Sequence, residues 1–201
     1  MKNEESLKYH FKKLFFDRVK EAGIDVKNYA IAGGALRDYL VGETIKDIDI
    51  FTNSLEAEIA IINFLNNNYE KINENESLAN FKVDGRWFQV IKKRYYDLKW
   101  DALIKTFDFT ICGIMLNGEE RLLVLPTFYQ DLLAKHLRVN ILQFPLSSLE
   151  RMQKYIKRGY TACNGTLLTL SKAIATVDFN NKDQAALEFY SDGSPRFIGI
   201  D

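Results

Sequence analysis

The chain has 201 residues, with 27 Lys and Arg against 27 Asp and Glu, so its net charge is close to zero. This length favours one domain, or one domain with a small extension, and the 47% content of apolar residues with only three prolines excludes a disordered chain. The charge balance excludes a uniformly basic nucleic-acid-binding protein, so any such surface must come from local basic clusters.

The first third of the chain is predicted to alternate helices and strands. Apolar residues at helical spacing indicate an N-terminal amphipathic helix, and alternation of polar and apolar residues from Asp47 indicates a strand. Asn53 or Ser54 is a suitable cap for the helix that follows. The expected elements are, in chain order, a helix over 5–21, a strand over 29–32, one or two helical turns over 35–40, a strand over 47–51 and a helix over 54–67.

The remainder is predicted to form two hairpins and then mainly helices. Asp84-Gly85 and Asn117-Gly118 are dipeptides typical of hairpin turns. The expected elements are a loop at 73–77, strands over 81–83 and 87–91, a helix over 100–106, strands over 109–116 and 121–125, helices near 128–138, 147–160 and 166–177, and two paired strands over 186–190 and 196–200. We therefore predict an α+β fold in which a mixed-sheet head over 1–140 is followed by a short helical neck over 141–201.

The surroundings in which the chain works are also suggested by its sequence. The two cysteines, Cys112 and Cys163, lack metal-type spacing and are expected to be reduced thiols. The charged N-terminus lacks the apolar stretch of a signal peptide, and no uncharged apolar run approaches the roughly 20 residues that span a bilayer. These observations predict a cytoplasmic protein without a membrane partner.

A glycine pair and a carboxylate pair form the sharpest motif. Gly33 and Gly34 lie at a predicted strand-to-helix turn, where backbone N–H groups can approach phosphate closely. Asp47 and Asp49 are two residues apart on a predicted strand, so their carboxylates point to the same face. Two such carboxylates can hold a pair of Mg²⁺ ions about 4 Å apart for phosphoryl transfer.

Each half of this motif also has a purely structural interpretation. A single Asp-x-Asp is more often a solvated strand face, and a single Gly-Gly is more often a plain turn. Arg37 lies between the two halves, and its guanidinium is suited to pair with phosphate. The combination therefore favours chemistry on a triphosphate.

Residues 33–52, GGALRDYLVGETIKDIDIFT, resemble the signature of the head domain of the poly(A) polymerase and tRNA CCA-adding family, within the DNA polymerase β-like nucleotidyltransferase superfamily. The resemblance extends over about 28–160, and the chain is as short as the compact members of the kind found in phage genomes. It implies that Gly33, Gly34 and Arg37 contact the triphosphate, that Asp47 and Asp49 bind two metal ions, and that Asp38 orients the loop.

Two later segments resemble the same family. Residues 107–112, FDFTIC, resemble the segment whose Asp lies at the sugar of the incoming nucleotide, which implies that Asp108 is the third catalytic carboxylate; it can alternatively cap or start a strand. Arg151, Lys154 and Arg158, with Tyr155 and Tyr160 beside them, resemble the neck helix that lies against the nucleotide, although a solvated helix face has the same pattern.

The segment 131–138, DLLAKHLR, resembles the family's connection between head and neck. On a continuous helix, Asp131 and Arg138 are two turns apart, so they share a face without direct contact. A structural role is expected for both. His136 is expected to be an ordinary helix residue without a catalytic partner.

Three departures from the family pattern concern catalysis and specificity. Gln89 stands where the family strand carries an acidic residue that supports the metals, and Phe107 stands where the family has Arg. The E-D-x-x-R element that reads the base is not evident, so base preference is not carried over.

The sequence thus predicts a Mg²⁺-dependent nucleotidyltransferase that moves a nucleoside monophosphate from ATP or CTP to an acceptor hydroxyl and releases pyrophosphate. The leading acceptor is an RNA 3′-OH, such as that of tRNA, with local RNA contacts from residues 92–96 and from the helix over 151–160. Transfer to a small molecule or a protein hydroxyl is an alternative, because the fold does not determine the acceptor. A catalytically weak nucleotide- or RNA-binding module is the other alternative, favoured by Gln89 and Phe107.

Overall fold

The computed structural model describes residues 1–92, 96, 98–178, 187–189 and 195–197, with side chains up to residue 178. The chain forms two compact units. The first, which we call the sheet unit, comprises Met1–Lys105 and Cys112–Leu125. The second, which we call the helical unit, comprises Thr106–Ile111 and Pro126–Asp201, so residues 126–140 group with it.

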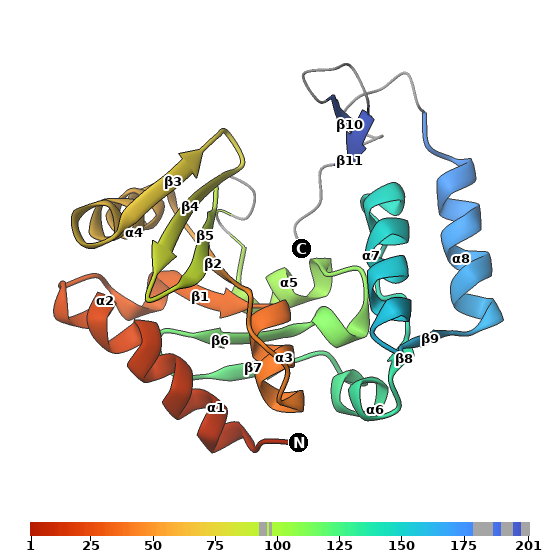
Figure 1. Ribbon diagram of the computed structural model, residues 1–201, viewed down its shortest axis with the longest axis horizontal. Coiled ribbons are helices and arrows are strands. Elements are labelled where there is room, and N and C mark those ends of the chain that lie inside the picture. Colours follow the sequence, from red (N-terminus) through yellow and green to blue (C-terminus); the bar gives the residue numbers. More distant parts are fainter. Residues whose placement is uncertain (93–95, 97, 179–186, 190–194, 198–201) are drawn as a thin grey trace. The chain divides into compact units, whose positions relative to one another are not determined.

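The sheet unit is built on a seven-stranded mixed sheet with the strand order β3-β4-β5-β2-β1-β6-β7 (Figure 1). Within this sheet, β2 and β5 pair in parallel, and all the other neighbouring strands pair antiparallel. The predicted α+β class with a mixed sheet is confirmed. The strands are β1 (Tyr29–Ala32), β2 (Asp47–Thr52), β3 (Glu70–Glu74), β4 (Leu78–Val83), β5 (Arg86–Ile91), β6 (Ile114–Asn117) and β7 (Leu122–Val124).

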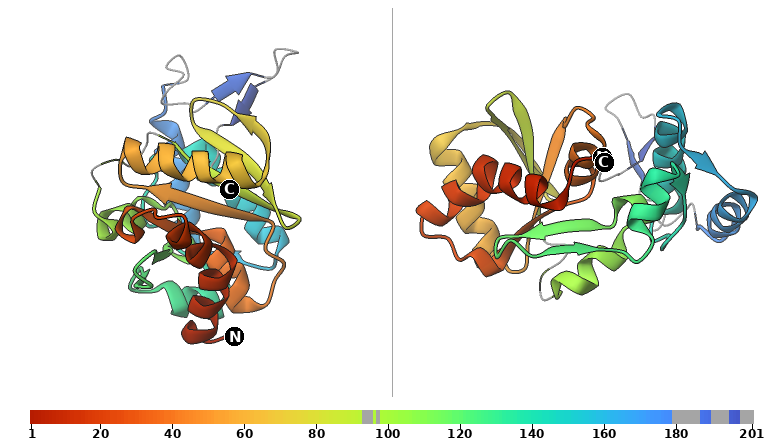
Figure 2. Two further views of the ribbon diagram at one scale, coloured as in Figure 1. Left: turned by 90° about the vertical axis from the view of Figure 1, so that its left-hand side faces the viewer. Right: turned by 90° about the horizontal axis from the view of Figure 1, so that it is seen from below.

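Helices of the sheet unit lie against this sheet (Figures 1 and 2). Phe15 and Phe16 of the N-terminal helical segment contact the rings of Tyr29 and Phe88, while α4 packs on β2 to β5. The predicted helix over 5–21 is confirmed, with one turn in π conformation. The bounds are α1 (Glu4–Phe11), the π turn η1 (Lys12–Phe16), α2 (Asp17–Glu21), η2 (Val26–Asn28), α3 (Gly34–Val41), α4 (Leu55–Asn68), α5 (Trp100–Leu103) and the 3₁₀ turns η3 (Ile104–Thr106) and η4 (Thr110–Cys112).

Local turn chemistry explains the hairpins that were predicted. Asp84 and Gly85 both have positive φ, 49° and 81°, which matches the two-residue hairpin turn that joins β4 to β5. The edge strand β3 was not predicted, and it occupies two residues of the expected loop at 73–77. All of its residues are exposed and most are charged or polar, as is common on a sheet edge, so it lacks the apolar alternation that identifies a strand.

The helical unit contains the C-terminal elements. Leu146, Met152 and Tyr155 of α7 are buried, as is Leu170 of α8. The predicted pairing of two strands near the C-terminus is confirmed for β10 and β11; residues 186, 190 and 198–200 of the predicted strands lie outside the described residues. The elements are α6 (Phe128–Leu133), β8 (His136–Leu137), α7 (Pro145–Lys157), β9 (Thr161–Ala162), α8 (Asn164–Ala175), β10 (Leu187–Phe189) and β11 (Pro195–Phe197).

Two predicted elements are wrong. The expected strand over 109–116 is a 3₁₀ turn followed by β6, which starts only at Ile114. The expected helix over 128–138 ends at Leu133, because Lys135 adopts a left-handed conformation (φ 49°) and the chain then runs back as β8, parallel to β9. His136 is therefore a strand residue, and Arg138 contacts Asp131 directly, with Nε 3.0 Å from Oδ2.

Within the described residues, no helix has both the length and the apolar character needed to cross a bilayer.

Candidate active site

The glycine motif forms a bend between β1 and α3. Gly33 has φ 79° and ψ −132°, a combination that residues with a Cβ rarely adopt. Its N–H donates to the carbonyl of Ile114 on β6 (2.8 Å), which ties the bend to the sheet. The first turn of the eight-residue helix α3 follows at Gly34, so its N–H groups have no partners within the helix. The bend thus has the backbone geometry that can receive an anion.

The two carboxylates of β2 lie beside this bend. Asp49 pairs with Ala32, the last residue of β1 before Gly33. Asp47 lies two residues earlier on the same strand, so both side chains are on one face of the sheet. The opposite face carries Ile48 and Ile50, which are fully buried. Asp49 is 4% exposed and Asp47 is half-buried, so the acidic pair lies at a sheltered position rather than on a solvated edge.

Arg37 is held in place on α3. Its side chain is 4% exposed, and its Nε lies 2.8 Å from Oδ1 of Asp38. Its Nη1 donates to the sulfur of Cys112 (3.7 Å), which lies two residues before the start of β6. A buried guanidinium is retained only where anionic or hydrogen-bonding partners hold it. Asp38 therefore fixes the orientation of Arg37, whereas the expectation from the sequence was that it orients the loop.

Gln89 lies on the strand next to the carboxylate pair. In the parallel register of β2 and β5, Asp49 pairs with Gln89, and paired residues share a face. The neutral amide is thus on the same face as the acidic pair, at the place where the sequence suggested an acidic residue in related proteins. It can offer an oxygen ligand or a hydrogen bond but no charge.

The donor set fits a metal that arrives with a nucleotide. Among the described residues, no group of three or more His, Cys, Asp and Glu could hold a metal ion. Mg²⁺ is commonly bound through one or two carboxylates together with substrate phosphates and water, rather than in an all-protein cage. Asp47 and Asp49 are the two carboxylates that could hold such an ion, next to the bend at Gly33.

Asp108 and Arg151 form an ion pair within the helical unit. Arg151 Nε lies 2.7 Å from Asp108 Oδ2, and the backbone N–H of Phe109 donates to Asp108 Oδ1 (2.9 Å). The side chain of Arg151 is 15% exposed and that of Asp108 is 8% exposed. Both residues were predicted as nucleotide contacts from separate segments, but a contact between residues 43 apart in sequence was not predicted, because it depends on how α7 packs.

Lys154 of α7 and Arg158, which directly follows this helix, have different surroundings. Lys154 is exposed and lies 3.4 Å from Glu150, and Arg158 lies over the ring of Tyr155, 5.8 Å from its centroid. Tyr155 and Tyr160 are 6% and 3% exposed. These two tyrosines therefore pack the interior of the helical unit and do not offer an exposed surface on which a base could stack.

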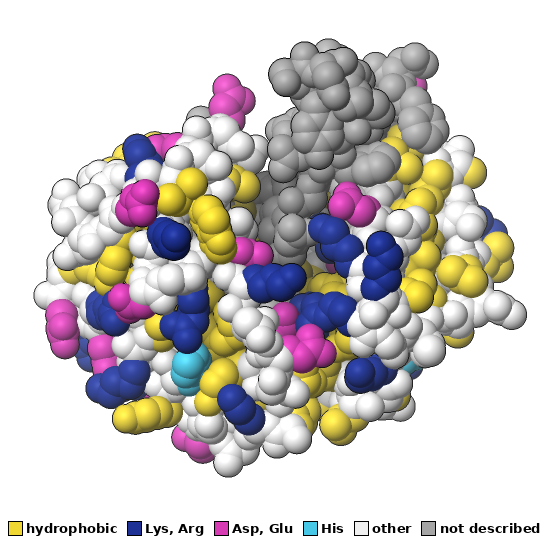
Figure 3. Space-filling view, viewed as in Figure 1, with side chains coloured by type: hydrophobic (Ala, Val, Ile, Leu, Met, Phe, Trp, Pro, Cys, Tyr) yellow, Lys and Arg dark blue, Asp and Glu magenta, His cyan; other side chains and the backbone are white. Residues whose placement is uncertain are grey.

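The basic segment over 92–96 is only partly described. Lys92 Nζ lies 2.9 Å from Glu74, and the hydroxyl of Tyr96 donates to the buried Glu58. Residues 93–95 lie outside the described residues. On the face shown in Figure 3, Lys and Arg side chains are interspersed with Asp and Glu, in keeping with the balanced charge.

Gly33→Ala is expected to destabilise the sheet unit by about 1–3 kcal/mol, because alanine is strained at φ 79°. Gly34→Ala is the matched control. A Cβ at Gly34 meets only Arg37 Nη2, at 3.5 Å, which is an ordinary contact. Its stability should therefore match or slightly exceed that of the parent. Both tryptophans, Trp87 and Trp100, lie in the sheet unit, so urea unfolding followed by tryptophan fluorescence reports on this unit. Equal midpoints for the two variants would contradict the strain at Gly33.

The fold is similar to that of known nucleotidyltransferases. A Thermotoga maritima CCA-adding enzyme complexed with tRNA matches with a TM-score of 0.64 and 19% identity over 88% of this chain and 47% of that one. A CCA-adding enzyme with CTP matches with a TM-score of 0.65 and 19% identity, over 87% of this chain and 46% of that one. A Bacillus stearothermophilus CCA-adding enzyme in complex with CTP matches with a TM-score of 0.57 and 18% identity, over 83% of this chain and 42% of that one. The chain thus spans about half the length of these enzymes, and at this identity the similarity shows the fold.

The sequence comparisons identify the family. No curated protein matches the chain. A family model described as "Gabija anti-defense 2 family protein" matches residues 5–135, which covers most of the sheet unit and the start of the helical unit. The solved structures confirm the resemblance seen in the sequence at the level of the nucleotidyltransferase fold. The family model matches more than half of the chain, and the chain therefore belongs to the Gabija anti-defense 2 family.

Proposed function

We propose that this protein is a Mg²⁺-dependent nucleotidyltransferase that moves a nucleoside monophosphate from a nucleoside triphosphate to an acceptor hydroxyl. One observation carries the proposal: the register of β1 and β2 pairs Asp49 with Ala32, beside the bend at Gly33. A carboxylate pair next to a glycine bend at the start of a helix suits metal-assisted phosphoryl transfer. The similarity of the fold to CCA-adding enzymes supports the same reaction class.

Each residue of the site has a proposed task. The N–H groups at Gly33 and Gly34 receive the triphosphate, and Arg37, oriented by Asp38, neutralises its charge. Asp47 and Asp49 would hold Mg²⁺, which, when bound, lowers the pKa of the acceptor hydroxyl and stabilises the leaving pyrophosphate. In the helical unit, the resemblance proposes Asp108, held by Arg151, as a contact of the ribose, and Lys154 and Arg158 as further contacts of the nucleotide.

We propose an RNA 3′-OH as the acceptor and ATP or CTP as the donor. The solved structures with this fold include a tRNA nucleotidyltransferase complexed with a primer tRNA and an incoming ATP analogue, which supports this pair of substrates. The present chain spans 49% of that enzyme. In its specific form, the proposal is that the acceptor is a tRNA and that the reaction takes place in the cytoplasm.

The family description favours a second acceptor. Members are described as Gabija anti-defense proteins. Nucleotidyl transfer to a hydroxyl of a defence component, whether a protein or a small molecule, would use the same site with a different acceptor. A nucleotide-binding module without turnover is the third candidate, which the neutral Gln89 beside Asp49 favours.

One experiment separates these candidates. The full chain is incubated with Mg²⁺ and each α-³²P-labelled nucleoside triphosphate, first with bulk RNA and then with a lysate that contains a Gabija system. Label in RNA, with one preferred base, supports the RNA acceptor, and label in a protein or a small molecule supports the second candidate. Nucleotide binding without label in any fraction would overturn the proposed reaction and leave the binding module.

A further inference from the structure

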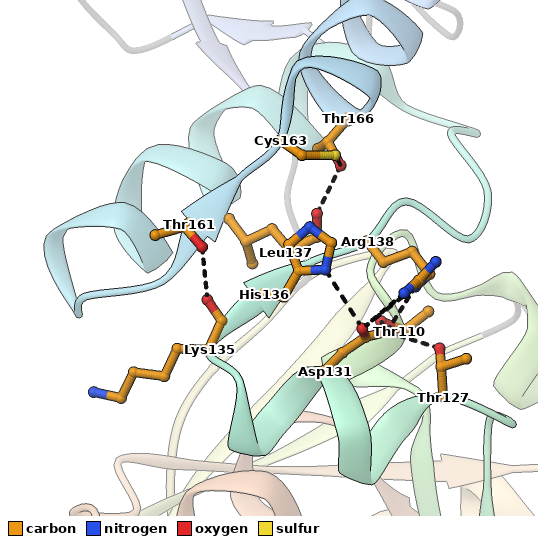
Figure 4. Close-up of polar contacts among 10 residues, drawn as sticks. All are labelled: Thr110, Thr127, Asp131, Lys135, His136, Leu137, Arg138, Thr161, Cys163 and Thr166. Atoms are coloured by element: carbon orange, nitrogen blue, oxygen red, sulfur yellow. Dashed lines mark hydrogen bonds and ion pairs between the residues drawn. The ribbon is translucent and has the colours of Figure 1, made fainter.

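Three side chains of the helical unit converge at a place that the proposed reaction does not use. Asp131 comes from α6, His136 from β8, and Cys163 from the residue that precedes α8 (Figure 4). The sequence separates them by up to 32 positions and gave no sign of their contact. They meet because the left-handed turn at Lys135 reverses the chain and β8 then pairs with β9, directly before Cys163.

Asp131 is the buried anchor of the group. It is 1% exposed and accepts hydrogen bonds from Thr110 Oγ1 and Thr127 Oγ1, both at 2.7 Å, and from Arg138 Nε at 3.0 Å. Although burial raises the pKa of Asp131, the hydrogen bonds from Arg138, Thr127 and Thr110 lower it below its usual value. The carboxylate is therefore ionised at neutral pH and presents a fixed negative charge.

His136 links this charge to the thiol. Its Nδ1 lies 3.6 Å from Asp131 Oδ1, and Figure 4 shows the other side of the ring facing Cys163. The His136 side chain is one of the groups that lower the pKa of the Cys163 thiol. This is the relation of carboxylate, imidazole and nucleophile that activates thiols.

The sulfur of Cys163 lies exposed at the start of the twelve-residue helix α8. The groups at the start of α8 and the His136 side chain lower the pKa of Cys163 to about 6, with the backbone of Thr166 as the largest cause. The hydroxyl of Thr166 lies 3.6 Å from the sulfur. The ionisable groups that face the thiol are His136, which lies 3.6 Å from Asp131, and Arg138. The positive charge of Arg138 favours the thiolate form of Cys163.

We propose that Cys163 is a nucleophilic thiolate that undergoes exchange with low-molecular-weight disulfides, which makes it a site of reversible covalent modification. The thiolate attacks one sulfur of a disulfide RSSR, the new Cys163–S–S–R bond forms as the R–S–S–R bond breaks, and the leaving RS⁻ takes the electron pair. A free thiol reverses the reaction by the same route. Neither Asp47 nor any other residue of the proposed transfer site takes part.

The other cysteine provides an internal comparison. Cys112 is buried, 6% exposed, and its sulfur accepts a hydrogen bond from Arg37. A disulfide reagent cannot reach it in the folded chain without local opening. Modification is therefore expected at one position, although the chain has two thiols.

The first experiment is exposure of the full, reduced chain to excess oxidised glutathione at pH 7, followed by intact-mass measurement and peptide mapping. We expect one glutathionyl adduct, located on Cys163, which dithiothreitol removes. Cys163→Ser should give no adduct while folding normally, because its side chain is exposed. An adduct that maps to Cys112, or the absence of an adduct while an unstructured cysteine peptide is modified, would overturn the proposal.

The second experiment measures the rate of alkylation by iodoacetamide against pH. The parent midpoint is expected near pH 6, as the lowered pKa of Cys163 implies. His136→Asn should move the midpoint up by about one unit, which lowers the rate near pH 5.5 about threefold once the greater nucleophilicity of a more basic thiolate is counted. His10→Asn changes the chain's other histidine, in the sheet unit, and should leave the midpoint unchanged. A parent midpoint above pH 8, or equal midpoints in the parent and His136→Asn, would refute the role of this cluster.

Discussion

Replacement of both Asp47 and Asp49 by Asn is expected to reduce nucleotidyl transfer at least about 1,000-fold in kcat, to the limit of detection. The two carboxylates are the proposed ligands of Mg²⁺, and metal stabilisation of charge in phosphoryl transfer accounts for several kcal/mol of the barrier. Asn has the same shape as Asp but no charge. The loss should therefore come from the missing ligands rather than from packing. Single-turnover transfer of label from the preferred nucleoside triphosphate measures it.

Two controls make this result specific to the site. Asp101→Asn removes a carboxylate that is 59% exposed on the same unit, and its transfer rate should equal that of the parent. The double variant should keep its thermal midpoint within about 4 °C of the parent, the shift that roughly 1 kcal/mol produces. Parent-like transfer by the folded double variant would show that β2 does not carry the catalytic carboxylates.

Asp131→Ala is expected to destabilise the helical unit by about 2–4 kcal/mol, a large effect for a single substitution. The carboxylate is 1% exposed and accepts hydrogen bonds from the hydroxyls of Thr110 and Thr127 and from the guanidinium of Arg138. These hydrogen bonds connect residues 106–111 with residues 126–138. Its removal leaves the buried hydroxyl of Thr110 without this acceptor. Both tryptophans lie in the sheet unit, so hydrogen exchange of the amides of 126–140 is the measurement that reports on the helical unit.

The two partners of the ion pair between Asp131 and Arg138 should differ in how much their replacement destabilises the helical unit. Arg138 is 47% exposed, so solvent screens its charge, and Arg138→Met should destabilise the unit much less than Asp131→Ala. The pH dependence follows from the lowered pKa of Asp131. Its ionised form stabilises the fold at and above the ordinary value of 3.8, and this contribution is lost as the pH falls below it. The advantage of the parent over Asp131→Asn should therefore shrink below pH 3.8. Equal losses for the Asp131 and Arg138 variants would contradict the asymmetry.

Elements with strong local signals were predicted well. The strand over 47–51 alternates polar and apolar residues, and β2 begins at the predicted residue. The hairpin at Asp84-Gly85 follows from two residues that tolerate positive φ. The edge strand β3 was missed because its residues are exposed on a sheet edge and do not alternate.

The C-terminal region was predicted less well for a different reason. Residues 128–138 contain good helix formers, but β8 gains a partner in β9, 25 residues away, and the helix stops at Leu133. Tertiary pairing thus overrode local propensity. The contact of Asp131 with Arg138 and His136 depends on this reversal, which no local pattern indicated.

The sequence by itself determined which reaction class to test and which residues of the sheet unit to change. Local backbone rules are sufficient for this, because they place glycines at a bend and put two Asp side chains on the same face of one strand. Only the tertiary structure decided that Asp49 lies beside that bend, that Arg151 pairs with Asp108, and that Cys163 meets His136. These contacts join residues distant along the chain, and the burial and pairing that create them exist only once the whole unit has packed.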